Sequence, residues 1–369
     1  ANITIYGDFD PTFVSTDNSI NLPTNLALWL DADDPSQITL AYSTTGTTAG
    51  GAIGTNTITT AANVSTYLQT GARIRLGASG AVTTADNVGA DTYTIASIAG
   101  TTITTVESLT STYAGSTLNK GLVSNWGDKG TVATDAAQGS AARRPLYIAS
   151  ESSYGGSGAV RFYRNLVNYM DLTPDLNNAG GGYNSIFYTM NWGGSGGMPF
   201  GFTGYDMYFA GAGFGVNNGA GNVYGVNSGS LLNTPHQLSI DFFNGVITGN
   251  QMSIDGVEQT ETFQVGGAGG SRNVTDAMRL SSWRNNTSYT MNNIMNEIII
   301  LLLQNVYETV KTIDQLSENA IDWISVYFED ISWKLKSPLF IEAIEKLITK
   351  FPDFKELETE VELAKEAIK

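Results

Sequence analysis

The pattern of apolar and polar residues divides the chain near residue 301. Before that point, apolar residues occur in short runs or in strict alternation between glycine-containing turns, a pattern that is typical of β-strands. After it, apolar residues recur at spacings of three and four, which is typical of amphipathic helices. The sequence therefore predicts a mainly β body followed by a helical segment over 302–369.

Two apolar runs are predicted to close the β body. The first, residues 26–30 (LALWL), ends in an acidic turn, and Trp29 is expected to anchor the core. The second, residues 296–300 (NEIII), lies almost at the end of the β region. First and last strands commonly pair in a closed sandwich, so we expect these two runs to lie side by side.

Residues 43–118 are predicted to form an inserted domain. The composition shifts to Thr, Ala and Gly, and the β-branched segments 54–60 and 100–105 repeat one another after a glycine-containing turn. Between them, residues 72–76 and 93–98 alternate with a period of two. We expect a small β-barrel or sandwich of about five strands, and the pattern resembles the small β-barrel modules of tailed-phage structural proteins.

Both ends of the chain are expected to lie outside this β body. Residues 1–25 contain one short alternating segment broken by Asp and Pro, and they predict an extended arm that lies on a neighbouring subunit or forms an edge strand. In the helical segment, Ser337-Pro338 predicts a helix start. The apolar seam of residues 354–368 is too short for a free coiled coil and needs packing partners. We interpret residues 302–369 as a docking or assembly element.

Composition and charge narrow the class of protein. Glycine is over-used at 41 residues and charged residues are only 15%, against roughly 25% in typical proteins, which favours a β-rich extracellular or virion protein. There is no cysteine, which excludes disulfides and thiolate zinc sites. The net charge of −16 repels phosphate backbones, so we expect no nucleic-acid binding. No apolar run is long enough to span a membrane, and residues 1–19 do not have the pattern of a signal peptide.

Four segments occur in an order that resembles a known family. They are residues 26–34 (LALWLDADD), 123–130 (VSNWGDKG), 142–147 (ARRPLY) and 159–162 (AVRF). The later strand and Asp-Gly turn at 252–257 belongs to the same series. Together with the closing run at 296–300, they resemble the laminin-G-like, concanavalin-A-like jelly-roll domains of bacterial and phage surface proteins. The resemblance implies an antiparallel jelly-roll β-sandwich formed by residues 26–42 and 119–301, whose variable loops carry any binding site.

Aromatic residues among glycines are candidates for a carbohydrate site, because exposed rings stack on sugar faces. The alternative is that about half of the aromatic residues between 183 and 224 fill the sandwich core. The residues that we select as glycan-binding candidates are Tyr183, Trp192, Tyr205, Tyr208 and Tyr224.

Three aspartates after the first strand are candidates for a calcium site. Calcium prefers clustered carboxylate oxygens, and Asp31, Asp33 and Asp34 are the densest acidic cluster near a predicted strand end. Laminin-G-like domains often bind calcium near loop carboxylates, so the resemblance implies the same metal. The alternative is an Asx-rich turn that ends the strand before Pro35.

The sequence does not predict an enzyme. Glycoside hydrolysis needs two carboxylates that flank the sugar, and the Glu-x-Asp-x-x-Glu motif of laminarinase-like relatives is absent. His236 is the only histidine and would be the only candidate base of a serine hydrolase, but no Gly-x-Ser-x-Gly elbow precedes a helix. We therefore expect His236 to have a structural role.

These expectations combine into one functional hypothesis with two alternatives. We expect a non-enzymatic virion structural protein, a capsid decoration, fibre or tail appendage, that forms a homo-oligomer and contacts other virion proteins. Its lectin-like sandwich would face the exterior and attach to host-surface glycans. The first alternative is a secreted bacterial carbohydrate-binding or adhesin domain at the cell surface, and the second is a glycoside hydrolase.

Overall fold

A computed structural model describes residues 26–302 and 310–368, with gaps. The gaps are 78–79, 83–90, 131–133, 174–182, 195, 203–205, 211–212, 218–221, 225–230, 244–245, 261, 265–276, 285–286, 288, 311–312, 314–320, 322–323 and 336. The predicted N-terminal arm, residues 1–25, lies outside the described residues. The chain divides into two compact units, residues 25–304 and residues 305–369 together with 1–24. Each is described by itself.

The first layer of the larger unit is an antiparallel sheet built on β23 (Asn293–Leu302). On one edge, β23 pairs with β13, and the order continues through β18 and β19 to β20. On its other edge β23 pairs with both β1 and β11, and β11 continues to β10. Leu28 lies opposite Ile300 and Leu30 opposite Ile298, so the predicted pairing of the two closing runs is confirmed. The bounds are β1 Leu26–Asp31, β10 Leu146–Glu151, β11 Ser157–Phe162, β13 Tyr183–Trp192, β18 Pro235–Phe243, β19 Val246–Ile254 and β20 Val257–Glu258.

The second layer is a row of shorter antiparallel strands. Its order is β21, β17, β16, β15, β14, β22, β12 and β9, and β9 joins it to β8 (Tyr113–Trp126). The bounds are β9 Ala136–Ala137, β12 Met170–Leu172, β14 Phe200–Phe202, β15 Asp206–Ala210, β16 Gly213–Asn217, β17 Asn222–Tyr224, β21 Thr262–Gln264 and β22 Met278–Leu280. Where the structure describes whole elements, four short 3-10 helices lie in the connections: η1 Pro35–Gln37, η2 Ala141–Arg143, η3 Ser152–Tyr154 and η4 Arg164–Leu166.

One hydrophobic core joins the two layers. Tyr188 on β13 meets Phe200 on β14 edge to face, with ring centroids 5.2 Å apart, and its hydroxyl lies 3.6 Å from the sulfur of Met207 on β15. Trp126, the largest fully buried side chain, belongs to the same core. The predicted mainly β, antiparallel sandwich is thus confirmed. The expectation for Trp29 is wrong: its neighbours Leu28 and Leu30 point into the core, so the alternation of the strand turns the Trp29 ring to the outer face, where it is only partly buried.

The predicted inserted β domain is a closed barrel. Strand β2 pairs with β8, β8 with β4, β4 with β6, β6 with β7, β7 with β3 and β3 with β2, so the ring contains six strands. Strand β5 pairs with β2. Inside, a second hydrophobic cluster includes Ile58, Ile74 and Tyr93. The bounds are β2 Ile38–Gly51, β3 Thr57–Thr60, β4 Arg73–Leu76, β5 Gly80–Val82, β6 Thr92–Ala99 and β7 Thr102–Thr105.

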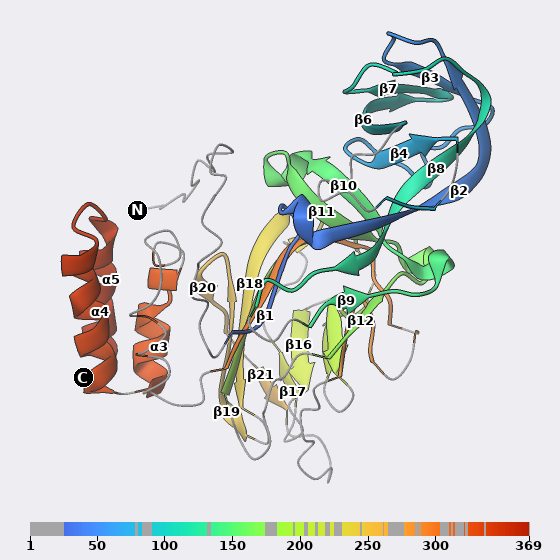
Figure 1. Cartoon of the computed structure of the whole chain (residues 1–369). Helices are drawn as coiled ribbons and strands as arrows, with labels where there is room; N and C mark the ends of the chain where they lie inside the picture. Colours follow the sequence, from blue (N-terminus) through green and yellow to red (C-terminus); the bar gives the residue numbers. More distant parts are fainter. Residues whose placement is uncertain are drawn as a thin grey trace. The chain divides into compact units, whose positions relative to one another are not determined.

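Two long strands connect the barrel to the sandwich without a linker. Strands β2 and β8 have 14 residues each, and their pairing runs from Ile38 opposite Trp126 to Gly51 opposite Tyr113 (Figure 1). A second connection is made at Gly71, whose N–H donates to Ile95 in the barrel and whose carbonyl accepts from Ala149 in the sandwich. The barrel and the sandwich are therefore joined by backbone hydrogen bonds at two places, the β2–β8 pair and Gly71.

The described residues of the smaller unit include three helices that share a core. They are α3 (Phe328–Leu335), α4 (Pro338–Lys350) and α5 (Glu356–Ala367), and Pro338 stands at the start of α4 as the sequence predicted. Helices α3 and α4 supply the packing partners that the apolar seam of α5 requires. No helix among the described residues is long and apolar enough to cross a membrane. The buried side chains include Phe328, Ile331, Phe340, Ile344, Leu347, Leu357, Val361 and Ala364.

Candidate functional site

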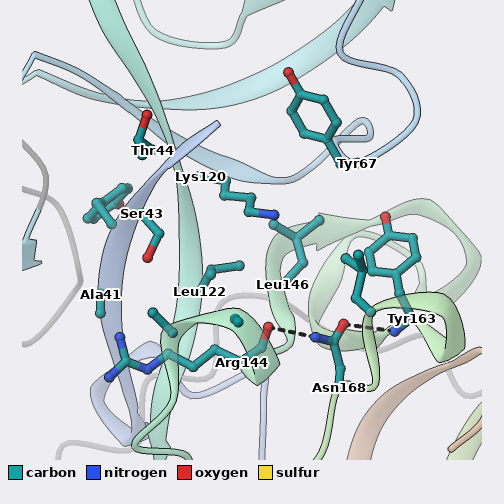
Figure 2. A pocket seen from close by; sticks show the side chains of 14 residues that line it. Ala41, Ser43, Thr44, Tyr67, Lys120, Leu122, Arg144, Leu146, Tyr163 and Asn168 are labelled. Atoms are coloured by element: carbon teal, nitrogen blue, oxygen red, sulfur yellow. Dashed lines mark hydrogen bonds between the residues drawn. The ribbon is translucent and has the colours of Figure 1, made fainter. Parts of the chain in front are cut away.

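A cavity of about 730 Å³ lies where the barrel meets the sandwich (Figure 2). The long strands β2 and β8 form one wall, and Tyr67 extends from a helical turn of the barrel. The opposite wall comes from the sandwich: the segment from η2 to β10, and residues 163–168 around η4. The lining residues are Ala41, Tyr42, Ser43, Thr44, Tyr67, Lys120, Leu122, Ala141, Ala142, Arg144, Leu146, Tyr163, Leu166 and Asn168.

Lys120 supplies a cation to this cavity. It lies in β8 opposite Ser43 of β2 and Ile74 of β4, so regular pairing on both sides fixes its backbone. Its ammonium lies 5.6 Å from the centre of the Tyr67 ring, a cation–π distance. Burial lowers the pKa of the Lys120 amine. Lys120 forms no ion pair with any residue that the structure describes.

Two tyrosine rings border the space into which Lys120 reaches (Figure 2). Tyr67 comes from the barrel and Tyr163 from the sandwich, and both are partly buried. Arg161 lies over the Tyr163 ring at 4.9 Å, which supports that ring from one face. Burial raises the pKa of the Tyr163 hydroxyl, so this group remains a neutral donor and acceptor at physiological pH.

The sandwich wall is held by its own hydrogen bonds. Buried Asn168 accepts from the Tyr163 N–H at 3.0 Å and donates through Nδ2 to the Arg144 carbonyl at 3.1 Å. The Arg144 guanidinium donates through Nε to the carbonyl of Gln138 and through Nη2 to that of Gly139. These bonds fix the wall before any ligand enters, which lowers the conformational cost of binding.

The chemistry of the cavity suits binding. Hydroxyls of Ser43, Thr44, Tyr67 and Tyr163 line it, and its charged side chains are Lys120 and Arg144. None of the described lining residues is acidic, so those residues do not provide the carboxylate pair that glycoside hydrolysis uses. An apolar and aromatic cavity with a few polar groups is the general form of a small-ligand site.

Of the five predicted glycan-binding aromatics, Trp192 is the one whose side chain the structure describes, and it does not line this cavity. Trp192 is only 6% exposed and packs against Phe209 in the sandwich core at 5.2 Å, so the predicted surface role does not fit it. Tyr183, Tyr208 and Tyr224 belong to β13, β15 and β17, whose backbone positions alone are described. Tyr205 lies outside the described residues. For these four tyrosines, glycan binding stays a prediction.

The predicted calcium cluster is occupied by a lysine of the protein. Lys129 Nζ lies 3.0 Å from Asp31 and 3.3 Å from Asp34, and also 4.5 Å from the centre of the Trp29 ring. Asp33 accepts the Gly158 N–H at 2.8 Å, while Asp34 caps η1 by accepting from the N–H of Ser36. Among the described residues, no group of three acidic or histidine side chains is placed to hold a metal ion. The aspartates therefore fit the Asx-turn alternative better than a calcium site.

His236 also has a structural partner. Its Nδ1 lies 2.7 Å from Oδ2 of Asp255, and Oδ1 of Asp255 accepts the Gln237 N–H at 2.9 Å. Asp255 and Gly256, with φ of 51° and 73°, form the predicted tight turn between β19 and β20. The contacts of His236 therefore tie the start of β18 to this turn, in agreement with the structural role expected from the sequence.

The sequence carries one signal for this cavity, the position of Lys120. Lys120 and Lys129 are the only lysines before residue 311, and only Lys129 has acidic neighbours within three residues. An isolated cation in an otherwise uncharged strand is a candidate for ligand binding. Tyr67, Tyr163 and Arg144 carry no comparable signal, because the fold alone brings them together.

Comparisons with known proteins give distant similarity in structure alone. No family model and no curated protein matches the chain. Among solved structures, the receptor binding domain of botulinum neurotoxin D aligns with a TM-score of 0.35 and 8% identity, over 53% of this chain and 50% of that chain. Domains LG4-5 of the mouse laminin α1 chain align with a TM-score of 0.26 and 15% identity, over 32% of this chain and 36% of that chain. The chain thus spans half or less of the length of these solved structures.

Proposed function

We propose that this protein is a non-enzymatic glycan-binding protein and that the cavity between barrel and sandwich is its saccharide site. The observation that carries the proposal is the combination of two partly buried tyrosine rings with hydroxyl groups around one open cavity. Sugars present apolar C–H faces that stack on aromatic rings, and hydroxyl edges that exchange hydrogen bonds with such polar groups. Hydrogen bonds around Asn168 hold one wall of the cavity in place before binding, which favours a saccharide of matching shape.

The composition of the cavity supports binding without hydrolysis. Cleavage of a glycosidic bond uses an acidic pair about 5–9 Å apart, and the described lining offers two cations in place of carboxylates. Turnover of a polysaccharide that is lost on substitution of a carboxylate would overturn this part of the proposal and favour the glycoside hydrolase alternative.

We also propose that the protein is a virion component, most plainly a decoration, fibre or tail appendage of a tailed phage. Support comes from the sequence resemblance to phage surface jelly rolls and from the inserted barrel. The helical unit, which has its own core, supports a role in assembly with other copies or with other virion proteins. A secreted bacterial adhesin with the same saccharide site is the alternative, and its localisation would be the cell surface.

The saccharide site is tested with glycan-array screening of the full chain, followed by calorimetric titration of the best ligand. Tyr67→Ala is expected to lower affinity about tenfold or more, because it removes one stacking face. Tyr289→Ala is the matched control, since Tyr289 is 46% exposed and does not line the cavity. An array without any bound glycan, or equal affinity of Tyr67→Ala and wild type, would contradict the proposal.

The virion role is tested by the mass of the protein in solution. A homo-oligomer that becomes a monomer when the chain is ended at Asn305 is the result expected of an assembly element. A full-length monomer would favour the adhesin alternative. The measurement is multi-angle light scattering of both chains at the same concentration.

A further inference from the structure

The two lysines of the larger unit have opposite surroundings. Lys129 is held by two carboxylates at 3.0 and 3.3 Å. Lys120 is partly buried and has no acidic partner among the described residues, although the chain as a whole carries a net charge of −16. A protein with such an excess of acidic groups can readily neutralise a buried cation internally, as it does at Lys129. No described residue plays that part at Lys120, whose ammonium faces the cavity.

An unpaired, partly desolvated ammonium favours an anionic ligand. Burial removes water from the Lys120 ammonium and lowers its pKa, because the charged form loses hydration, and an incoming negative group restores the lost interaction. The Tyr67 ring compensates only in part, because a cation–π contact at 5.6 Å is weak beside an ion pair.

We infer that the saccharide bound in this cavity carries a carboxylate, and that this carboxylate pairs with Lys120 while the sugar ring lies against Tyr67 or Tyr163. This inference rests on the proposed saccharide site and names its ligand class, an acidic sugar of the uronic or ulosonic type. Lys120 lies on the long strand β8, and the opposite wall of the cavity comes from η4 and β10. The ligand would therefore contact both the barrel and the sandwich.

The remaining groups favour a carboxylate over a phosphate. Arg144 is the second cation, but its Nε and Nη2 already donate to the carbonyls of Gln138 and Gly139. The Nε–Nη2 edge of Arg144 is therefore already engaged, and the ammonium of Lys120 matches the single negative charge of a carboxylate. A dianion would also meet stronger repulsion from a chain of net charge −16.

The experiment uses the full chain and a glycan array in which each acidic glycan stands beside its carboxyl-reduced, neutral counterpart. The best pair is then titrated by calorimetry against wild type, Lys120→Gln, Lys120→Arg and Lys346→Gln. Lys346 is exposed on α4 and lies outside the cavity, so its substitution gives the same change of charge without a change in the site. Melting curves of all variants establish that they are folded.

The expected result is a preference for the acidic member of the pair. Lys120→Gln should lower its affinity about tenfold or more and leave the neutral counterpart unchanged, since a charge-assisted hydrogen bond is lost only with the acidic ligand. Lys120→Arg should retain most of the preference, and Lys346→Gln should behave as wild type.

Two results would overturn the inference in different ways. Equal binding of both members of the pair, or no effect of Lys120→Gln, would overturn the carboxylate and leave the saccharide site standing. Failure of the wild-type chain to bind any glycan would overturn the proposed function and the carboxylate together.

Discussion

The indole N–H of Trp29 donates a hydrogen bond to the carboxyl group of Glu297, 268 residues later in the chain, at 2.8 Å. The two residues lie on β1 and β23, the strands that close the sandwich, and Glu297 stands directly opposite Asp31. Burial first, and then the charge of Asp31, raise the pKa of Glu297 from 4.5 to about 7. A proton on this carboxyl therefore relieves repulsion at the seam of the fold.

Glu297 should make stability depend on pH in a definable direction. Because the folded carboxyl has the higher pKa, the folded state binds more protons than the unfolded state between about pH 4.5 and 7. The contribution of Glu297 to stability is present below pH 4.5 and is lost as the pH rises through 7. Glu297→Gln, which keeps an acceptor for Trp29, should be more stable than wild type at pH 8 by about 1–3 kcal/mol.

The measurement for Glu297 is urea denaturation of both proteins at pH 5 and pH 8. At pH 5 the two should differ little, and Glu258→Gln, an exposed substitution in β20, should show no comparable change with pH. A stability difference between Glu297→Gln and wild type that is the same at both pH values would disprove the assignment.

Lys129 is predicted to make added calcium ineffective. Its ammonium neutralises Asp31 and Asp34, and Lys129→Met should therefore cost about 1–3 kcal/mol, because it leaves their carboxylates close to each other and to Glu297. Millimolar calcium should not raise the Tm of wild type. A calcium-dependent rise of the wild-type Tm, read by calorimetry with magnesium as the control, would restore the calcium hypothesis for this cluster.

Gly71 is predicted to be indispensable where the barrel meets the sandwich. Its φ is +81°, and a Cβ atom there would lie 2.0 Å from the carbonyl oxygen of Ser150. Gly100 is the matched control, because its φ is +62° with open space around the added atom. Gly100→Ala should cost about 1 kcal/mol from backbone strain alone, whereas Gly71→Ala should cost several kcal/mol more. Equal losses of stability in thermal denaturation would show that the backbone moves aside without cost.

The sequence predictions succeeded where a structural feature depends on residues close together in the chain, and failed where it depends on distant ones. The seam could be predicted because Leu28, Leu30, Ile298 and Ile300 are apolar and mark a buried strand pair. The helices could be predicted from the spacing of their apolar residues, while the sequence left open whether the small β domain is a barrel or a sandwich. Trp29 could not be placed, because an entirely apolar run does not reveal which alternate positions face the core.

The candidate site was the least predictable part for the same reason. Lys120, Tyr67 and Tyr163 meet only because the register of β2 and β8 and the turn before β4 bring them to one space. The Asp31 cluster looked like a calcium site because its neutralising partner, Lys129, is distant in sequence. Trp192 lies among polar residues and glycines in the sequence, and only the position of the second layer over it explains its burial.

We predict that the helical unit can unfold while the sandwich stays folded. Phe340 is fully buried and meets Phe328 edge to face, with ring centroids 5.9 Å apart, while its neighbour Leu339 is 49% exposed. Phe340→Ala should remove about 3–4 kcal/mol, enough to unfold three short helices, and Leu339→Ala should change stability by less than about 1 kcal/mol. Far-ultraviolet circular dichroism should show loss of helix in Phe340→Ala only.

Because the sandwich and barrel have their own cores, hydrogen exchange of β13 and β23 should stay as slow in Phe340→Ala as in wild type. Faster exchange in those strands would mean that the two units fold together, and the helices would then be part of the body of the protein rather than a separable assembly element.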